Sequence, residues 1–93
     1  MEFYRAKPVS GIKADYSLNK DEEEHFVNEV IEKFDSTYEG YFDQYKDCVL
    51  YENHQKLISE ILYICKDDKK LRNLYIFFNE CYLSKKMLYY ISD

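Results

Sequence analysis

The sequence predicts a mainly α-helical fold, a small domain of three or four helices preceded by an extended N-terminal arm. The chain contains only two glycines and one proline, at Gly11, Gly40 and Pro8, so residues 41–93 hold neither. Turns in β-proteins usually need such residues, and their absence favours helices. Apolar residues beyond residue 19 recur at steps of three and four, which is typical of helices with one buried face. We therefore expect one domain over residues 1–93, with the arm over 1–18 and a helical core over 19–93.

The arm is expected to be extended because its apolar residues do not recur at helical spacing. Residues 3–18 contain Pro8 and the pair Ser10-Gly11. Alternation of apolar and charged residues over 12–16 is a weak strand signal. A short hairpin turning at Ser10-Gly11 is the second interpretation of this segment. Since a single hairpin is not stable alone, we expect it to pack on the helices.

The first helix is expected to begin at Asn19. Glu22 lies three residues later, which completes the pattern of a capping box. The acidic run 21–24 then occupies the first turn, where the positive end of the helix dipole favours it. An apolar stripe continues from Phe26 to Tyr38, and Gly40 either ends this helix or is tolerated within it.

A second helix is the preferred prediction for residues 41–51, where apolar residues continue at helical spacing. The competing prediction is a strand over 48–51, because β-branched and aromatic residues cluster there. Asn53 and His54 indicate a break. A third helix carries the stripe from Leu57 to Cys65, and Asp67-Asp68 both ends it and caps the next.

The last helix has a nearly continuous apolar run over 74–78, and its pattern resumes after Lys85. Such a run indicates the centre of the bundle or an interface. The predicted core is drawn from all these helices and comprises Phe26, Val30, Ile31, Phe34, Leu57, Ile61, Leu62, Leu71, Leu74, Tyr75 and Phe78.

Composition narrows the classes of function. The chain has 93 residues, a formal net charge of −5 and a pI near 5.0, so phosphate-rich partners would be repelled. We therefore expect no direct binding of nucleic acid and no membrane binding. No apolar run approaches the length of about 18 residues that spans a bilayer, and the first residues lack a secretory signal. Three widely spaced cysteines, Cys48, Cys65 and Cys81, indicate a reducing compartment, so we expect a cytoplasmic protein.

No catalytic or cofactor motif is present in the sequence. Phosphate-binding glycine loops, dinucleotide fingerprints, zinc-protease motifs and paired cysteines are all missing. The two histidines, His25 and His54, are interpreted as a solvated residue and a helix-boundary residue. We therefore predict a protein that is not an enzyme and needs no cofactor or metal.

Charge placement is more informative than the amount of charge. Residues 21–47 hold ten acidic residues and two lysines, a net charge of −8, whereas residues 66–86 have a net charge of +3. On a helix, acids at three- and four-residue steps would repel one another, and tyrosines recur beside them. A solvated face is the ordinary interpretation. The sharper one is a partner-binding face comprising Asp35, Tyr38, Glu39, Tyr41, Asp43, Tyr45 and Asp47.

Two classes of function fit these features. The first is a small acidic, non-catalytic protein that binds and neutralises a larger basic protein, as an inhibitor, immunity protein or antitoxin does. A phage-encoded inhibitor of a bacterial nuclease or of a nucleic-acid-handling defence complex would be of this type. The alternative is a self-associating regulatory or adaptor module, a homodimer joined through residues 74–78 and 89–91.

A basic cluster lies at Lys66, Lys69, Lys70 and Arg72. Because it contains two acids, Asp67 and Asp68, we expect it to keep the start of the last helix soluble and not to bind phosphate specifically.

Overall fold

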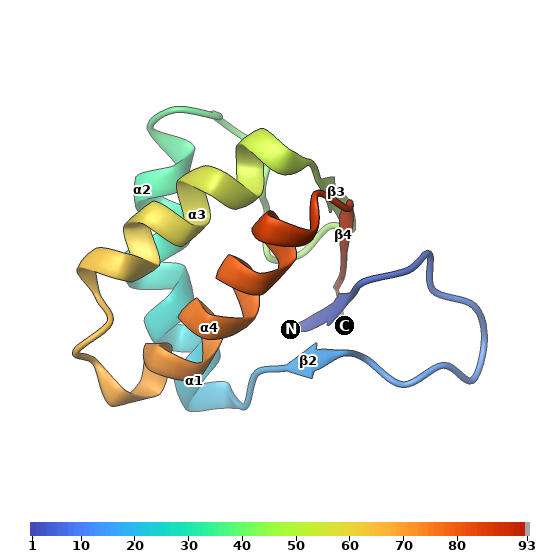
Figure 1. The fold of residues 1–93 in the computed structure, drawn as a ribbon. Helices are drawn as coiled ribbons and strands as arrows, with labels where there is room; N and C mark the ends of the chain where they lie inside the picture. The colour runs from blue at the N-terminus through green and yellow to red at the C-terminus, as the bar shows by residue number, and fades with distance from the viewer. Residues whose placement is uncertain (93) are drawn as a thin grey trace.

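The protein has an α+β fold, which corrects the mainly α-helical prediction. The computed structural model describes residues 1–92, and in it helices pack against a four-stranded antiparallel sheet (Figure 1). The strand order is β2-β1-β4-β3. The helical-bundle expectation failed because the strands are only two to four residues long, so none of them shows the alternation that identifies a strand.

The N-terminal segment contributes the inner strand β1 and the edge strand β2 to the sheet, and it also packs on the helices as expected. Strand β1 (Glu2–Tyr4) lies between β2 (Tyr16–Ser17) and β4 (Leu88–Ile91), and Phe3 pairs with Tyr90 across the ladder. The long connection from β1 to β2 extends away from the body (Figure 1). It does turn at Ser10-Gly11, where the Ile12 N–H donates to the Val9 carbonyl at 3.2 Å and Gly11 has a φ of +85°.

The first helix begins where the sequence places it. Helix α1 (Lys20–Phe26) continues through a π-helical segment, η1 (Val27–Ile31), into α2 (Glu32–Asp35). The capping box is confirmed: the Glu22 N–H donates to Asn19 Oδ1 at 2.8 Å, and the Asn19 N–H donates to Glu22 Oε1 at 3.0 Å. Phe26, Val30 and Phe34 lie four residues apart, a spacing that keeps them on one side of a helix, and all three are buried.

The predicted second helix over 41–51 is wrong, and the competing strand is right. A loop follows α2 and leads into β3 (Cys48–Leu50), which pairs with β4 at the sheet edge. Within this loop Phe42 is buried at 3% exposure, whereas Tyr45 is 79% exposed. The helical spacing of these aromatic residues was therefore fortuitous, because they do not share one buried face.

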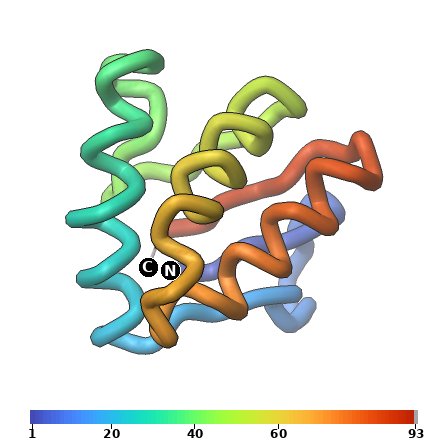
Figure 2. Tube along the Cα trace, turned by 60° about the vertical axis from the view of Figure 1, so that its left-hand side comes forward, coloured from blue at the N-terminus to red at the C-terminus, as the bar shows by residue number. Residues whose placement is uncertain are grey.

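The two remaining helices form a packed pair beside α1 (Figure 2). Helix α3 (Glu52–Ile64) is followed by α4 (Lys69–Ser84), and Asp68 caps α4 by accepting the Lys70 N–H at 2.9 Å.

The residue after the last turn of α4 is Lys85, which has a φ of 58° and a ψ of 30°. This left-handed conformation costs a lysine about 1–2 kcal/mol, which exceeds the roughly 0.3–1 kcal/mol that a cation gains at a helix C-terminus.

The core lies between the helices and one face of the sheet, with Phe3 at its centre. The Phe3 ring is fully buried and contacts aromatic rings from α1, α4, β4 and the loop before β3. Of the predicted core residues, Ile31, Leu57 and Tyr75 are only partly buried and pack against its outside, and the others are buried. The buried residues that the sequence analysis missed come largely from the sheet and the loops and include Met1, Phe3, Leu18, Phe42, Leu50, Leu88 and Tyr90.

Candidate functional site

The predicted acidic face forms a loop and not a helical stripe. We call residues 35–47 the acidic loop; it runs from the last residue of α2 to the start of β3. Three of its four carboxylate side chains accept hydrogen bonds from backbone N–H groups and so fix the conformation of the loop. Asp35 Oδ1 accepts the Gly40 N–H at 2.6 Å, and Asp43 Oδ1 accepts the Tyr45 N–H at 2.9 Å. Asp47 Oδ1 accepts both the N–H and the hydroxyl of Ser92, at 2.8 and 3.0 Å. The acids therefore do not repel one another along a helix, as the sequence suggested.

Two of the three tyrosines in the acidic loop pack on His54. The Tyr41 ring stacks on the imidazole with centroids 4.1 Å apart, and the Tyr38 ring meets it edge-on at 4.8 Å. The Tyr41 hydroxyl donates to the Val49 carbonyl, and the Tyr38 hydroxyl accepts from Asn53 Nδ2 at 3.1 Å. The start of the loop is therefore fastened to α3 and β3.

His54, which the sequence analysis interprets as a helix-boundary residue, caps the start of α3 and organises the aromatic residues around it. It is 6% exposed, and its Nδ1 accepts the Tyr51 N–H at 3.0 Å, which caps α3. Nδ1 must be unprotonated to accept, so the neutral ring carries its proton on Nε2. Burial lowers the pKa of His54 below its usual value. Its position three residues after a helix N-cap was the one signal of this role in the sequence.

Tyr45 and Glu39 are the members of the predicted site that face solvent without a structural role. Tyr45 has 79% of its surface exposed, and the Glu39 side chain is exposed with no hydrogen bond or ion pair in residues 1–92. A tyrosine exposed to this extent on a loop fixed by backbone hydrogen bonds can contact a partner at little entropic cost.

The acidic loop also borders an acidic cleft that the sequence did not reveal. The cleft has a volume of about 540 Å³ and lies between Gln44 of the loop and the solvent side of α1 and η1. Asp21, Glu23 and Glu24 line it together with a single cation, Lys20. The tertiary fold thus extends the negative surface of the loop to the acids at the start of α1.

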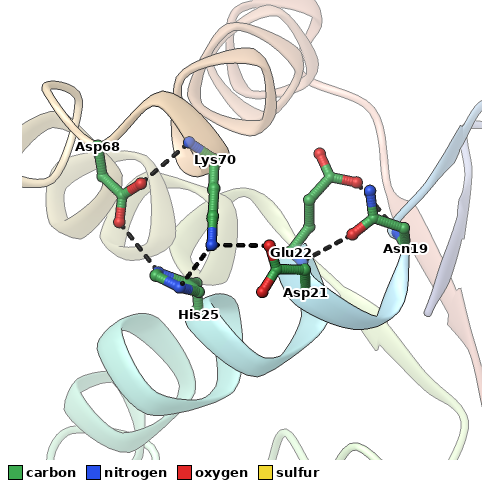
Figure 3. A network of polar contacts seen from close by, with 6 residues as sticks. All are labelled: Asn19, Asp21, Glu22, His25, Asp68 and Lys70. Atoms are coloured by element: carbon green, nitrogen blue, oxygen red, sulfur yellow. Dashed lines mark hydrogen bonds and ion pairs between the residues drawn. The ribbon is translucent and has the colours of Figure 1, made fainter.

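A polar network joins α1 to the start of α4 (Figure 3). His25 Nδ1 lies 3.1 Å from Asp68 Oδ2, and its Nε2 lies 3.5 Å from Lys70 Nζ. Lys70 Nζ also pairs with Asp21 Oδ2 at 2.7 Å. This hydrogen bond lowers the pKa of Asp21, and the Lys70 N–H similarly lowers the pKa of Asp68. Both imidazole nitrogens of His25 therefore make polar contacts, and the network links α1 to the start of α4.

The basic residues that lie close together in the sequence make separate contacts in the structure. Lys70 belongs to the polar network, and the Arg72 Nε–H donates to the Lys66 carbonyl at 3.4 Å. Lys66 Nζ lies 3.6 Å from the centre of the Tyr63 ring.

The three cysteines, Cys48, Cys65 and Cys81, are free thiols. Burial raises the pKa of Cys48 to about 12 and that of Cys81 above its usual value. Thiols with raised pKa values are poor nucleophiles at neutral pH.

Neither a metal cluster nor a membrane span is found in residues 1–92. No three His, Cys, Asp or Glu side chains in that range are arranged to hold a metal ion, and no helix there is long and apolar enough to cross a bilayer. Comparison of the chain with protein-family models, with curated proteins and with solved structures found no match.

Proposed function

We propose that this chain is a small, non-catalytic binding protein that docks its acidic loop and the adjoining acidic cleft on a larger basic protein and neutralises it. The observation that carries the proposal is Tyr45, 79% exposed beside Asp43 in a loop fixed by its own hydrogen bonds. Tyrosine is enriched among the residues that dominate binding energy at protein interfaces. A rigid loop that presents an unpacked tyrosine among carboxylates supports recognition of a cationic surface.

The acidic cleft supplies the second part of the argument. Three carboxylates and one ammonium line this site of about 540 Å³. Glu23 Oε2 lies 3.6 Å from the N-terminal ammonium, and Asp21 is paired with Lys70, which leaves Glu24 exposed and without an ion pair in residues 1–92. A lysine or arginine side chain of the partner would enter beside Glu24, and Tyr45 would contact the partner from the loop residue next to Gln44.

The alternative, a homodimer through residues 74–78 and 89–91, has less support. Leu74, Phe77 and Phe78 are buried in the protein's own core. Strand β4 is an inner strand, so its backbone already pairs with β1 and β3. Our proposal retains a cytoplasmic location, since the three free cysteines fit a reducing compartment.

Photo-crosslinking tests the proposal while the partner is still unidentified. Tyr45 is replaced by p-benzoylphenylalanine, and the matched control carries the same replacement at Tyr63, which is 53% exposed on α3. Cells expressing each variant are irradiated, and adducts are identified by mass spectrometry. We expect position 45 to give a distinct adduct with a protein of basic pI, and position 63 to give none of that species.

Two outcomes would contradict the proposal. Equal yields of one adduct from both positions would mean that contact does not depend on the acidic loop. A partner captured at position 45 that has an acidic pI would remove the charge argument, because like charges across an interface cost affinity.

A further inference from the structure

A basic cleft lies at the end of α4, opposite in character to the acidic loop. It has a volume of about 340 Å³, and Arg5, Lys7, Lys85 and Lys86 supply four cations to its lining, which contains no aspartate or glutamate. The chain leaving β1 and the turn from α4 into β4 form it, on the same side of the molecule (Figure 1). In a protein with a net charge of −5, four cations from two distant segments converge on one cleft.

Most of this positive charge is not neutralised by the protein itself. Arg5 Nη2 pairs with Glu80 Oε2 at 3.3 Å, and the Arg5 N–H donates to Asp15 Oδ2 at 2.7 Å. Lys7, Lys85 and Lys86 have no ion pair within the described part of the chain. The Arg5 pair is solvent-exposed on both sides, so an anion in the cleft can compete for the guanidinium.

Lys85 occupies a backbone position that favours glycine. It is the one non-glycine residue with a positive φ among residues 1–92, and it ends α4. Glycine is the preferred residue at such a helix terminus because it has no Cβ to clash in the left-handed region. A lysine here is the less stable choice for the fold, and its side chain contributes one of the four cations of the cleft.

From these observations we propose that the basic cleft binds a small molecule carrying a chain of phosphates, such as a nucleoside triphosphate. The volume falls within the range of roughly 300–1,000 Å³ that is typical of small-molecule sites. Guanidinium and ammonium groups are the side chains that bind phosphate oxygens. Tyr89 and Met87 line the same cleft and offer an aromatic ring and an apolar side chain to the non-phosphate part of the ligand. A long nucleic acid is disfavoured, since the acidic remainder of the protein would repel it.

The test is a titration of the ¹⁵N-labelled full chain with ATP and with inorganic triphosphate, followed by amide NMR shifts. We expect shifts concentrated at residues 5–7 and 85–89, and a dissociation constant about tenfold weaker for Lys86→Gln, equivalent to one charge-assisted hydrogen bond. Lys85→Gly should weaken binding similarly and also raise the melting temperature. Tyr89→Ala should weaken ATP binding more than triphosphate binding. The matched control is Lys33→Gln, which removes an exposed lysine of α2 and should bind as the wild type does.

Three results would overturn the proposal. The first is an equal loss of affinity in Lys33→Gln and Lys86→Gln, which would indicate attraction by overall charge alone. The second is shifts spread over the surface with no concentration at the cleft. The third is tighter binding of a single-stranded oligonucleotide than of ATP, which would assign the surface to nucleic acid instead.

Discussion

Replacing Phe3 by alanine should remove a large part of the stability of the fold. Phe3 is fully buried, and its ring lies 5.2–6.4 Å from the centres of five other aromatic rings, those of Phe26, Phe42, Phe77, Phe78 and Tyr90. Truncation of a buried phenylalanine costs about 3–5 kcal/mol, and each aromatic pair adds about 0.5–1.5 kcal/mol to simple burial. The dense ring contacts place our expectation toward the upper end of the range. A domain of 93 residues has a total stability of about 5–14 kcal/mol.

The assay is urea denaturation followed by far-ultraviolet circular dichroism, with the melting temperature as a second readout. We expect a loss of about 3–5 kcal/mol and a fall in melting temperature of roughly 12–40 °C. The matched control is Tyr45→Ala, which truncates an exposed aromatic residue and should change stability by less than about 0.5 kcal/mol. A cost for Phe3→Ala below about 1 kcal/mol would refute the reasoning, because it would mean that the N-terminal segment is an arm after all.

Two further predictions concern local contacts. Stability should fall as the pH drops below about 6.5, which is the ordinary pKa of histidine. Burial lowers the pKa of His54 in the folded state, so the unfolded chain binds the proton more tightly and is favoured at low pH. Urea midpoints measured across this pH range check the prediction, and His54→Gln should flatten the change, since the amide oxygen can still accept the Tyr51 N–H but does not titrate. Asn19→Ala should cost about 1 kcal/mol through loss of the helix cap. An unchanged urea midpoint for that variant would show that the cap contributes nothing.

The structural features that were predictable from the sequence are the local ones. The cap at Asn19 and the cap at Asp68 were recognised because a helix start depends on residues within one turn. The stripe of Phe26, Val30 and Phe34 was recognised because the helix is long enough to show its period.

The sheet was missed because its pairing is set by residues far apart in the chain. Strand β1 has three residues, and it is stable because Phe3 pairs with Tyr90 from the other end of the sequence. Spacing over 41–49 imitated a helix, although a loop and a strand were the outcome. Non-local packing overrides such local patterns when segments are short.

The partner-binding role of residues 35–47 stays a prediction, and the helical shape expected for this segment is wrong. Acids and tyrosines between residues 35 and 47 are present at the surface, but Asp35, Asp43 and Asp47 also bind backbone N–H groups within their own region or at Ser92. The acidic cleft could not be predicted, since only the tertiary fold brings Gln44 beside Glu24.

The most direct test of the acidic surface is the rate at which the crosslinked partner associates with two charge-reversal variants. Glu24→Lys reverses one charge in the acidic cleft, and Glu80→Lys makes the same change to an exposed glutamate on α4 that lines neither the acidic loop nor the cleft. We expect Glu24→Lys to slow association about tenfold at low salt, with a smaller loss at high salt, because screening weakens steering between exposed charges. Glu80→Lys should slow it much less. Equal rates for the two variants at both salt concentrations would contradict the proposal that the acidic loop and cleft bind a basic partner.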